Sequence, residues 1–538
     1  MIIFNVMTNI DVPVIEDTSI LSEKRENPSP DFYRIGNSWL KKNKFGLWEM
    51  YLEGSPFEIG VINGKLTKEL IKLQEDSFVD QINTLIPSSS YLKFLKYFIL
   101  WFNRDIENYI PREYIEEIYG VSFSAADGYE MIGSKYERML NYHGAHDIGH
   151  ALQSLALVGC TSFAANMGLE DSSFILGRNF DFYINEDFAK NKIVAFVHPD
   201  NGYDFTYVTW ASMIGVVSGM NEAGLTVTIN AAKSDIPGKA KMPISLLARE
   251  ILQYAGNIDE AVAIAKKRET FVSESLLIGS ASDNMAVIIE KSPTKLDVYS
   301  TDADDLVCSN HYQSDAFGND PNNTRYIEES ATLYRQTRCE QLLSQYDEIT
   351  YKEAADILRD TDGLDGSDIG IGNEKAMAQF ISHHSIIFKP FQRELWVSTK
   401  PYQFGAYLGY NTTDVFETYK QVKANSILYD TLLTIAADSS HLLLVENLTV
   451  YRKLKEELKS YISENKRFDG DSLLISKLIS YNPDYYHGYV LAGNYFYQIG
   501  NFAEAYRFYS RSLDKEFENT TTREMVKVRL EELKEKTD

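Results

Sequence analysis

At 538 residues, the chain is longer than one hydrophobic core usually organises, so two or three domains are expected. Hydrophobic residues make up 44% and charged residues 24%, which is ordinary for a folded globular protein and excludes global disorder. The net charge of -24 argues against nucleic acid as a partner and against electrostatic docking on anionic membranes.

The N-terminal part is predicted to be mainly helical. Residues 1 to about 45 are polar and irregular in pattern. A strand from Trp48, a turn and a helix follow, with Ser55 as the helix N-cap and Pro56 at the first helical position. Apolar residues then recur at helical spacing for about a hundred residues. We therefore predict a helical N-terminal segment over 1–159.

The pattern changes at Gly159 to short runs of β-branched and aromatic residues separated by turns, which is typical of strands. The first group of predicted strands is 173–179, 193–198, 203–210, 216–220 and 225–231. A helical stretch over 243–267 precedes the second group, 275–280, 286–291, 296–300 and 306–308. Helices over 330–346 and 352–359 precede a last pair of strands, 385–388 and 394–398. This order predicts an α+β layered domain over 160–420.

The sequence is predicted to be helical again after Lys420. Residues 483–516 resemble one tetratricopeptide unit, with small residues where two helices would cross and Gly500 in the turn. One unit cannot bury its own face, so it must pack on a neighbour. A plain helical hairpin is the alternative. We predict a helical, tetratricopeptide (TPR)-like C-terminal region over 421–538, with a protein as its possible partner.

The three cysteines, Cys160, Cys308 and Cys339, do not form a disulfide framework or a zinc motif, so free thiols are expected. Cys160 follows a glycine, and a thiol becomes a good acyl acceptor as a thiolate. If the bond before Cys160 is cut, its own α-amine supplies a base with an unperturbed pKa of about 7.7–8.0. Gly159 would leave the attacked upstream carbonyl accessible. An isolated Gly-Cys pair more often marks a buried structural cysteine.

A charged pair downstream makes the pattern more specific. Arg178 and Asp181, in Gly-Arg-Asn-Phe-Asp, lie three residues apart in a predicted strand region. Charge-assisted hydrogen bonds from this pair would hold the amine and the thiolate or the substrate carbonyl. The combination predicts a cysteine that acts as a latent N-terminus.

These motifs carry a family resemblance. Cys-Thr-Ser-Phe-Ala from Cys160, Gly-Arg-Asn-Phe-Asp from Gly177 and Gly-Met-Asn-Glu-Ala-Gly-Leu from Gly219 are similar to the N-terminal nucleophile (Ntn) hydrolases. Within them, the chain resembles the choloylglycine hydrolase and acyl-coenzyme A:6-aminopenicillanic acid acyltransferase group, the C45-type autoproteolytic acyltransferases, from about 52 to 397. The resemblance implies a four-layer αββα sandwich, an autocatalytic cut between Gly159 and Cys160, and action on linear amide or ester carbonyls.

The resemblance also implies roles for single residues. Cys160 takes the nucleophile position, Arg178 and Asp181 the pair that positions it, Asn230 the oxyanion-hole asparagine, Asn310 a second active-site asparagine and Arg338 the distal arginine. Arg335 is the alternative for the last role, and turn roles are the alternative for both asparagines. A segment of 159 residues precedes the cysteine, and the region after about 420 lies outside the shared core. The substrate class therefore does not transfer directly.

A histidine run lies just before the predicted cut. His143, His146, Asp147 and His150 fall on one helical face, and His383-His384 follow later. Zinc is conceivable there, but a structural or processing role is favoured, so we predict no metal. No glycine-rich phosphate loop occurs, and no cofactor is predicted.

The predicted function is an autoproteolytically activated cysteine amidohydrolase or acyltransferase that forms a thioester with a small acyl amide, ester or acyl-CoA-like substrate. The rival is a catalytically inactive binding or scaffold protein that uses its C-terminal helices. The apolar stretch 91–102 is too short to span a bilayer and contains two lysines. A soluble protein is expected, cytoplasmic if Met1 is the native start and exported if a signal was removed. No motif specifies the acyl group, the acceptor or the oligomeric state.

Overall fold

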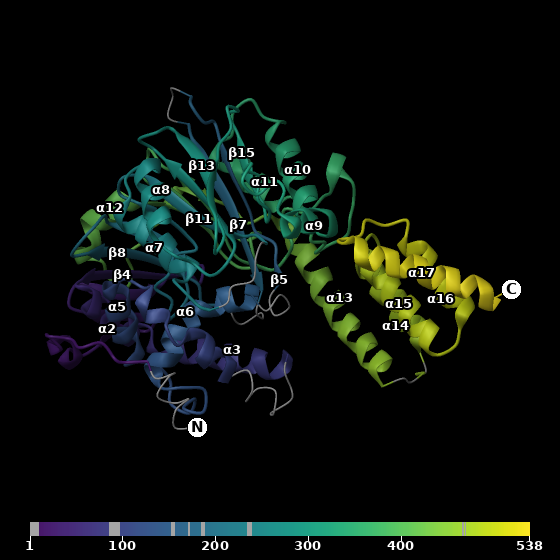
Figure 1. Cartoon of the computed structure of the whole chain (residues 1–538), viewed down its shortest axis with the longest axis horizontal. Helices are drawn as coiled ribbons and strands as arrows, with labels where there is room; N and C mark the ends of the chain where they lie inside the picture. The colour runs from purple at the N-terminus through teal and green to yellow at the C-terminus, as the bar shows by residue number, and fades with distance from the viewer. Residues whose placement is uncertain are drawn as a thin grey trace.

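A computed structural model describes residues 10–85, 97–151, 157–169, 173–183, 189–233, 239–464, 467–468 and 470–537. Two β-sheets with helices on their outer sides form the main body, and a group of helices forms a lobe at the C-terminal end (Figure 1). The two sheets position the predicted site, because the motif residues lie on strands of both.

The larger sheet has eleven strands in the order β1-β2-β3-β4-β8-β9-β10-β11-β12-β13-β14. Its strands are β1 (Glu26–Ser29), β2 (Phe32–Ile35), β3 (Ser38–Lys42), β4 (Trp48–Gly54), β8 (Ile193–Pro199), β9 (Phe205–Thr209), β10 (Ser218–Asn221), β11 (Leu225–Ala231), β12 (Glu274–Ser280), β13 (Met285–Lys291) and β14 (Leu296–Tyr299). Its neighbours are antiparallel, apart from the parallel pair β4 and β8. The N-terminal strands therefore extend the sheet that the later chain builds.

The smaller sheet has the order β15-β6-β7-β16-β17-β18-β19, and β5 also pairs with β7. Its strands are β5 (Leu157–Val158), β6 (Thr161–Ala165), β7 (Ile175–Tyr183), β15 (Leu306–Cys308), β16 (Ser382–Lys389), β17 (Glu394–Ser398), β18 (Tyr407–Asn411) and β19 (Asp430–Ile435). Both β5 and β6 run antiparallel to β7. The Gly159-Cys160 junction thus lies beside the strand that carries Arg178 and Asp181.

Three clusters of buried apolar side chains define the layers. One lies between the sheets and contains Phe196 of β8 and Leu176 of β7. A second covers the outer face of the larger sheet with α2 (Pro56–Leu66), α5 (Arg112–Ser122), α6 (Lys135–Ala151), α7 (Ile244–Tyr254) and α8 (Ile258–Lys267). A third covers the outer face of the smaller sheet with α10 (Thr332–Leu343) and α11 (Tyr351–Arg359). The order helix, sheet, sheet, helix agrees with the expected αββα layering.

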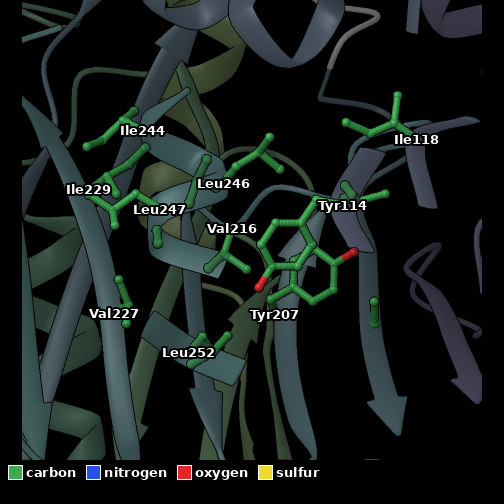
Figure 2. Packing of buried hydrophobic residues seen from close by; sticks show 14 of the residues in the cluster. Tyr114, Ile118, Tyr207, Val216, Val227, Ile229, Ile244, Leu246, Leu247 and Leu252 are labelled. Carbon is green, nitrogen blue, oxygen red and sulfur yellow. The ribbon is translucent and has the colours of Figure 1, made fainter. Parts of the chain in front are cut away.

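Helix α5 of the N-terminal segment belongs to the second cluster. Figure 2 shows its Tyr114 and Ile118 in one cluster with Tyr207 of β9, Ile229 of β11 and Leu252 of α7. The Tyr114 hydroxyl also donates a hydrogen bond to Gln253 Oε1 at 3.4 Å. The upstream helices therefore share a core with the strands that follow the predicted cut.

The N-terminal segment is less helical than its sequence predicts. Residues 26–42, within the stretch expected to be irregular, form β1, β2 and β3. The predicted helix start is confirmed: α2 begins at Pro56, and its N-cap Ser55 forms a capping box with Glu58. Helix α3 (Lys68–Leu85) follows. The segment is thus a mixed element built into the larger sheet.

Several helices and one strand differ from the sequence-based expectation. The predicted helical stretch 243–267 forms two helices, because Asn257 caps a new helix, α8, through a hydrogen bond from the Glu260 amide. Helix α9 (Pro321–Glu329) contacts α10 and α17, helix α12 (Thr412–Thr418) contacts β8 and β18, and strand β19 appears where only helix was expected.

The C-terminal lobe, which we define as residues 439–537, contains α13 (Ser439–Ser463), α14 (Asp471–Tyr481), α15 (Tyr486–Gln498), α16 (Phe502–Ser512) and α17 (Thr520–Thr537). Its helices form a group beside the sheets (Figure 1), and their buried apolar side chains cluster together with Ala378, Phe380 and Phe404. A Cβ at Gly493 would lie 2.6 Å from the Tyr509 ring, so α15 and α16 approach closely at a small residue, as predicted. In the described residues, no helix is both long and apolar enough to cross a membrane.

Candidate active site

The Gly159-Cys160 junction joins two short strands that share one partner. Both β5 and β6 pair with β7 in the same antiparallel register, and the Gly159 amide donates to the Asp181 carbonyl oxygen at 3.1 Å. Continued through the junction, this register places Gly159 opposite Asp181 and Cys160 opposite Phe180. Since opposite residues share a face of a sheet, Cys160 faces the larger sheet and Gly159 faces the outer helices.

The Cys160 side chain is buried, with 1% of its surface exposed. Its Sγ lies 3.6 Å from Arg178 Nη2 and 3.8 Å from the Asp181 carbonyl oxygen. Burial raises the pKa of the Cys160 thiol to about 11, although the Arg178 charge lowers it, and Asp181 and Glu274 raise it further. In the uncut chain the thiol is therefore mostly protonated at neutral pH.

Arg178 connects the two sheets beside this sulfur. Its Nη1 donates to the Val217 carbonyl oxygen at 3.0 Å and to Ser218 Oγ, and its Nη2 donates to the Ile229 carbonyl oxygen. The guanidinium is fully buried, and burial lowers its pKa. Acceptors on β10 and β11 thus fix a cation whose Nη2 reaches the Cys160 sulfur.

Asp181 is a buried carboxylate on the same strand. Among the residues that the structure describes, neither of its carboxylate oxygens has a hydrogen-bond partner. Burial raises the pKa of Asp181 to about 7, and the charges of Arg335 and Arg178 partly offset this. A new positive charge placed beside this carboxylate would be strongly favoured.

Asn230 and Asn310 connect the end of β11 to the segment after β15. Asn230 Nδ2 donates to the carbonyl oxygens of Cys308 at 2.8 Å and Ser309 at 3.2 Å, and its Oδ1 accepts from Ser162 Oγ at 3.2 Å. Asn310 Nδ2 donates to a backbone carbonyl of β11 at 2.9 Å. Both amide nitrogens are thus hydrogen-bonded to backbone carbonyls in the uncut chain.

The structure brings Arg335, and not Arg338, to the junction. Arg335 Nε donates to Thr161 Oγ1 at 2.7 Å, and its Nη2 lies 3.5 Å from the Cys160 carbonyl oxygen and donates to Asn310 Oδ1. Arg338, one turn later on α10, instead forms an ion pair with Asp360 at 2.8 Å. Of the two arginines that the sequence offers for the distal position, Arg335 is therefore the one at the junction.

Two further residues near the junction belong to no motif that the sequence analysis identified. Gln379 is buried, and its Nε2 donates to the Gly159 carbonyl oxygen at 2.6 Å. Glu274, at the start of β12, is fully buried, and burial raises its pKa well above the ordinary value, with Asp147 adding to the shift. Gln379 is 220 residues from Gly159 in sequence, so only the fold could reveal its position.

The histidines form hydrogen bonds within the protein. His143 is buried, with Nδ1 2.7 Å from the Met139 carbonyl oxygen and Nε2 accepting from the Ile214 amide at 3.0 Å. The side chains of His146 and His150 lie outside the described residues. His384 Nε2 lies 2.9 Å from Ser218 Oγ, and its Nδ1 lies 2.9 Å from His383 Nδ1. Where side chains are described, no group of three or more His, Cys, Asp or Glu is placed to hold a metal ion.

Comparisons with known proteins find a family that is similar to this part of the chain. Residues 168–400 match the family model described as acyl-coenzyme A:6-aminopenicillanic acid acyl-transferase. The matched range contains Arg178, Asp181, Asn230, Asn310 and Arg335, and begins eight residues after Cys160.

Relatives and a solved structure are similar over part of the chain. An uncharacterized protein of Archaeoglobus fulgidus is 26% identical over 281 residues, 47% of this chain and 45% of that protein. The N-acylethanolamine-hydrolyzing acid amidase of Caenorhabditis elegans is 26% identical over 225 residues, 40% of this chain and 59% of that enzyme. The solved ortholog of this amidase has 19% identity and a TM-score of 0.32, covering 43% of this chain and 93% of its own.

The matched segments span about half the length of the curated relatives. The family match and the motifs around β7 agree on the same part of the chain. Over residues 168–400 the chain is therefore similar to the acyl-coenzyme A:6-aminopenicillanic acid acyl-transferase family.

Proposed function

We propose that this protein is a self-processing cysteine amidohydrolase or acyltransferase. The observation that carries the proposal is a buried thiol beside Arg178, next to a glycine that lies opposite Asp181, a carboxylate whose two oxygens have no hydrogen-bond partner among the described residues. Cleavage of the Gly159–Cys160 bond would create an ammonium group next to this carboxylate. The chain would then consist of a 1–159 fragment and a fragment that begins with its nucleophile.

In the processed enzyme, Cys160 Sγ attacks the carbonyl carbon of a linear amide or ester, and its proton passes to the Cys160 α-amine. The Arg178 charge stabilises the thiolate that forms. The tetrahedral oxyanion needs a hydrogen-bond donor. Asn230 Nδ2 supplies it by giving up its hydrogen bond to the Cys308 or Ser309 carbonyl oxygen and donating to the oxyanion instead. The α-ammonium then protonates the leaving amine or alcohol, and a thioester remains.

The second half of the reaction releases the acyl group. The α-amine removes a proton from water, or from an acceptor amine or alcohol, which attacks the thioester carbon. The carbon–sulfur bond breaks and the thiol is restored. Asp181 holds the amine through both halves, and Arg335 fixes the Cys160 backbone and Asn310. No metal or cofactor takes part in this sequence.

The substrate class rests on the relatives. One curated relative is an amidase that hydrolyses N-acylethanolamines, so small N-acyl amides are the first substrates to test. The 160–420 core would carry this activity. The 421–538 region, which we still regard as TPR-like, would serve a partner or the core itself.

A covalent trapping experiment tests the proposal. The purified protein is mixed with N-acyl amides of increasing chain length, quenched in acid and examined by intact mass. We expect the fragment that begins at Cys160 to gain one acyl group, and Cys160→Ala to gain none. A wild-type protein that is uncut and inert towards all of these acyl amides would instead favour the scaffold alternative.

A further inference from the structure

Gln379 contacts the carbonyl group of the bond that the proposed processing breaks. Its Nε2 donates to the Gly159 carbonyl oxygen at 2.6 Å, and the residue is 2% exposed. A Cβ added at Gly159 would lie 2.2 Å from Gln379 Oε1. The carboxamide therefore packs against the Gly159 Cα as well as binding its oxygen, and any larger residue at 159 would displace it.

The core holds Gln379 from one side. Asn179, the central residue of the Gly-Arg-Asn-Phe-Asp motif, donates from Nδ2 to the carbonyl oxygens of Met377 at 2.9 Å and Leu358 at 2.8 Å. The Ala378 amide donates to the Asp360 carbonyl oxygen at 2.9 Å. The two residues before Gln379 are thus tied to β7 and to the end of α11.

The C-terminal lobe holds the same loop from the other side. We call residues 369–380 the junction loop. Asn482 forms two hydrogen bonds with the Ile371 backbone, each at 2.8 Å. Glu518 Oε1 accepts from the Glu374 amide at 3.1 Å, and Arg452 Nη2 donates to the Phe380 carbonyl oxygen at 2.9 Å. The lobe therefore binds the backbone on both sides of Gln379.

We propose that Gln379 is the oxyanion donor for self-cleavage, positioned by a loop that the C-terminal lobe holds in place. This inference rests on the proposed processing at Gly159-Cys160. The Cys160 thiol attacks the Gly159 carbonyl carbon, and negative charge develops on the oxygen that Gln379 already binds. The thiol proton passes to the departing nitrogen, the carbon–nitrogen bond breaks, and a Gly159 thioester and a free Cys160 amine result. Water then hydrolyses the thioester to the Gly159 carboxylate and the thiol.

The position of Gln379 separates this role from that of Asn230. Asn230 hydrogen-bonds to Ser162 and to carbonyls of the segment after β15. Gln379 lies on the scissile carbonyl itself. One donor thus serves the cut, which happens once, and the other serves turnover. Removal of one preorganised oxyanion donor typically slows a reaction about 10²- to 10³-fold.

A time course of cleavage tests the role of Gln379. Gln379→Met keeps the length of the side chain but removes its donors. Gln253→Met is the matched control, because Gln253 is also buried and donates to one backbone carbonyl, of Asn201, at 2.8 Å. By intact mass after synthesis, we expect cleavage of Gln379→Met to be slower by about 10²- to 10³-fold, and that of Gln253→Met to match the wild type.

A second variant separates donation from packing. In Gln379→Glu, only the protonated carboxyl can donate, so its cleavage rate relative to wild type should rise as the pH falls. Melting of Cys160→Ala with and without Gln379→Met checks that the fold is kept. Cleavage of Gln379→Met within about threefold of wild type, well below the cost of a lost donor, would overturn the inference but leave the processing claim intact. An active but uncut wild type would overturn the processing claim itself.

Discussion

The upstream segment and the C-terminal lobe both extend beyond the family-matched range, but they attach to the core in different ways. Strand β4 of the upstream segment pairs with β8 along seven positions, and its helices share the cluster that covers the larger sheet. The lobe packs around a separate cluster, which also contains Ala378 and Phe380 of the junction loop, and it hydrogen-bonds to that loop through Asn482, Glu518 and Arg452. Figure 1 shows the upstream helices against the sheets and the lobe standing apart.

This difference assigns a stabilising role to the upstream segment and a positioning role to the lobe. A strand in a sheet and a shared core do not depend on the covalent bond at the junction, so the upstream fragment should stay bound after the proposed cut. The lobe instead determines the position of a loop. Losing contacts of the upstream segment should therefore reduce stability, whereas losing contacts of the lobe should chiefly slow the cut.

The largest effect is expected where the upstream segment shares a buried ion pair with the core. Glu117 of α5 and Arg249 of α7 lie 3.2 Å apart, with 3% and 1% of their side chains exposed. Glu117→Ala would leave the Arg249 charge buried without this partner and should cost about 3–5 kcal/mol. Urea unfolding of the uncut Cys160→Ala chain measures this. Glu116→Ala, which removes a surface pair with Arg112, is the control and should cost no more than about 1 kcal/mol.

The next effect concerns Asp181, which lies opposite Gly159 on strand β7. Its folded-state pKa of about 7 lies above the ordinary value of 3.8. The folded chain therefore keeps a proton that the unfolded chain loses as the pH rises from about 4 to 7, and the unfolding free energy falls across this window, by roughly 4 kcal/mol. In the Cys160→Ala background, Asp181→Asn should flatten this pH dependence. An unchanged slope would mean that Asp181 does not have a raised pKa.

A smaller effect is expected from the contact between the lobe and the junction loop. Asn482→Ala removes both hydrogen bonds to Ile371 and should cost about 1–2 kcal/mol while slowing cleavage several-fold. Asn494→Ala is the control, because the side-chain oxygen of Asn494 accepts a hydrogen bond from the Tyr509 hydroxyl within the lobe. Equal cleavage rates for the two variants would show that the lobe does not position the loop.

The smallest effect on cleavage is expected at Arg338. Its largely buried guanidinium pairs with Asp360, with 6% and 14% of the two side chains exposed, so Arg338→Met should reduce stability but leave cleavage unchanged. Arg335→Met is the comparison, since it removes the contacts to Thr161 and Asn310 and should strongly slow cleavage. Equal cleavage rates for the two variants would contradict the placement of Arg335, and not Arg338, at the junction.

Local patterns predicted the parts of the fold that local forces determine. The Ser55-Pro56 helix start and the close packing at Gly493 follow from capping and from side-chain size. Strands β1 to β3 were missed because each is only four or five residues long, and they are held by pairing with one another and with β4. Among the site residues, the motifs pointed to Arg178 on β7 and Asn230 on β11, and the structure places these residues against Cys160 and Ser162, respectively.

Long-range contacts could not be read from the sequence. Arg335 and Arg338 are one turn apart on one helix, and only the packing of α10 on β6 decides which of them reaches the junction. Gln379 precedes the histidine pair at the start of β16 without any motif, and its role appears only when the loop is placed over Gly159. The sequence motifs thus grouped Cys160 with Arg178, which the structure also brings together, but gave no sign of the residue that contacts the Gly159 carbonyl.

The central claim is that Cys160 is a latent N-terminus, and the mass of the purified protein tests it most directly. Wild type should yield one fragment that ends at Gly159 and one that begins at Cys160, and the two should co-elute under native conditions. Cys160→Ala should yield one intact chain. A wild-type protein that hydrolyses acyl amides while remaining a single uncut chain would contradict this claim.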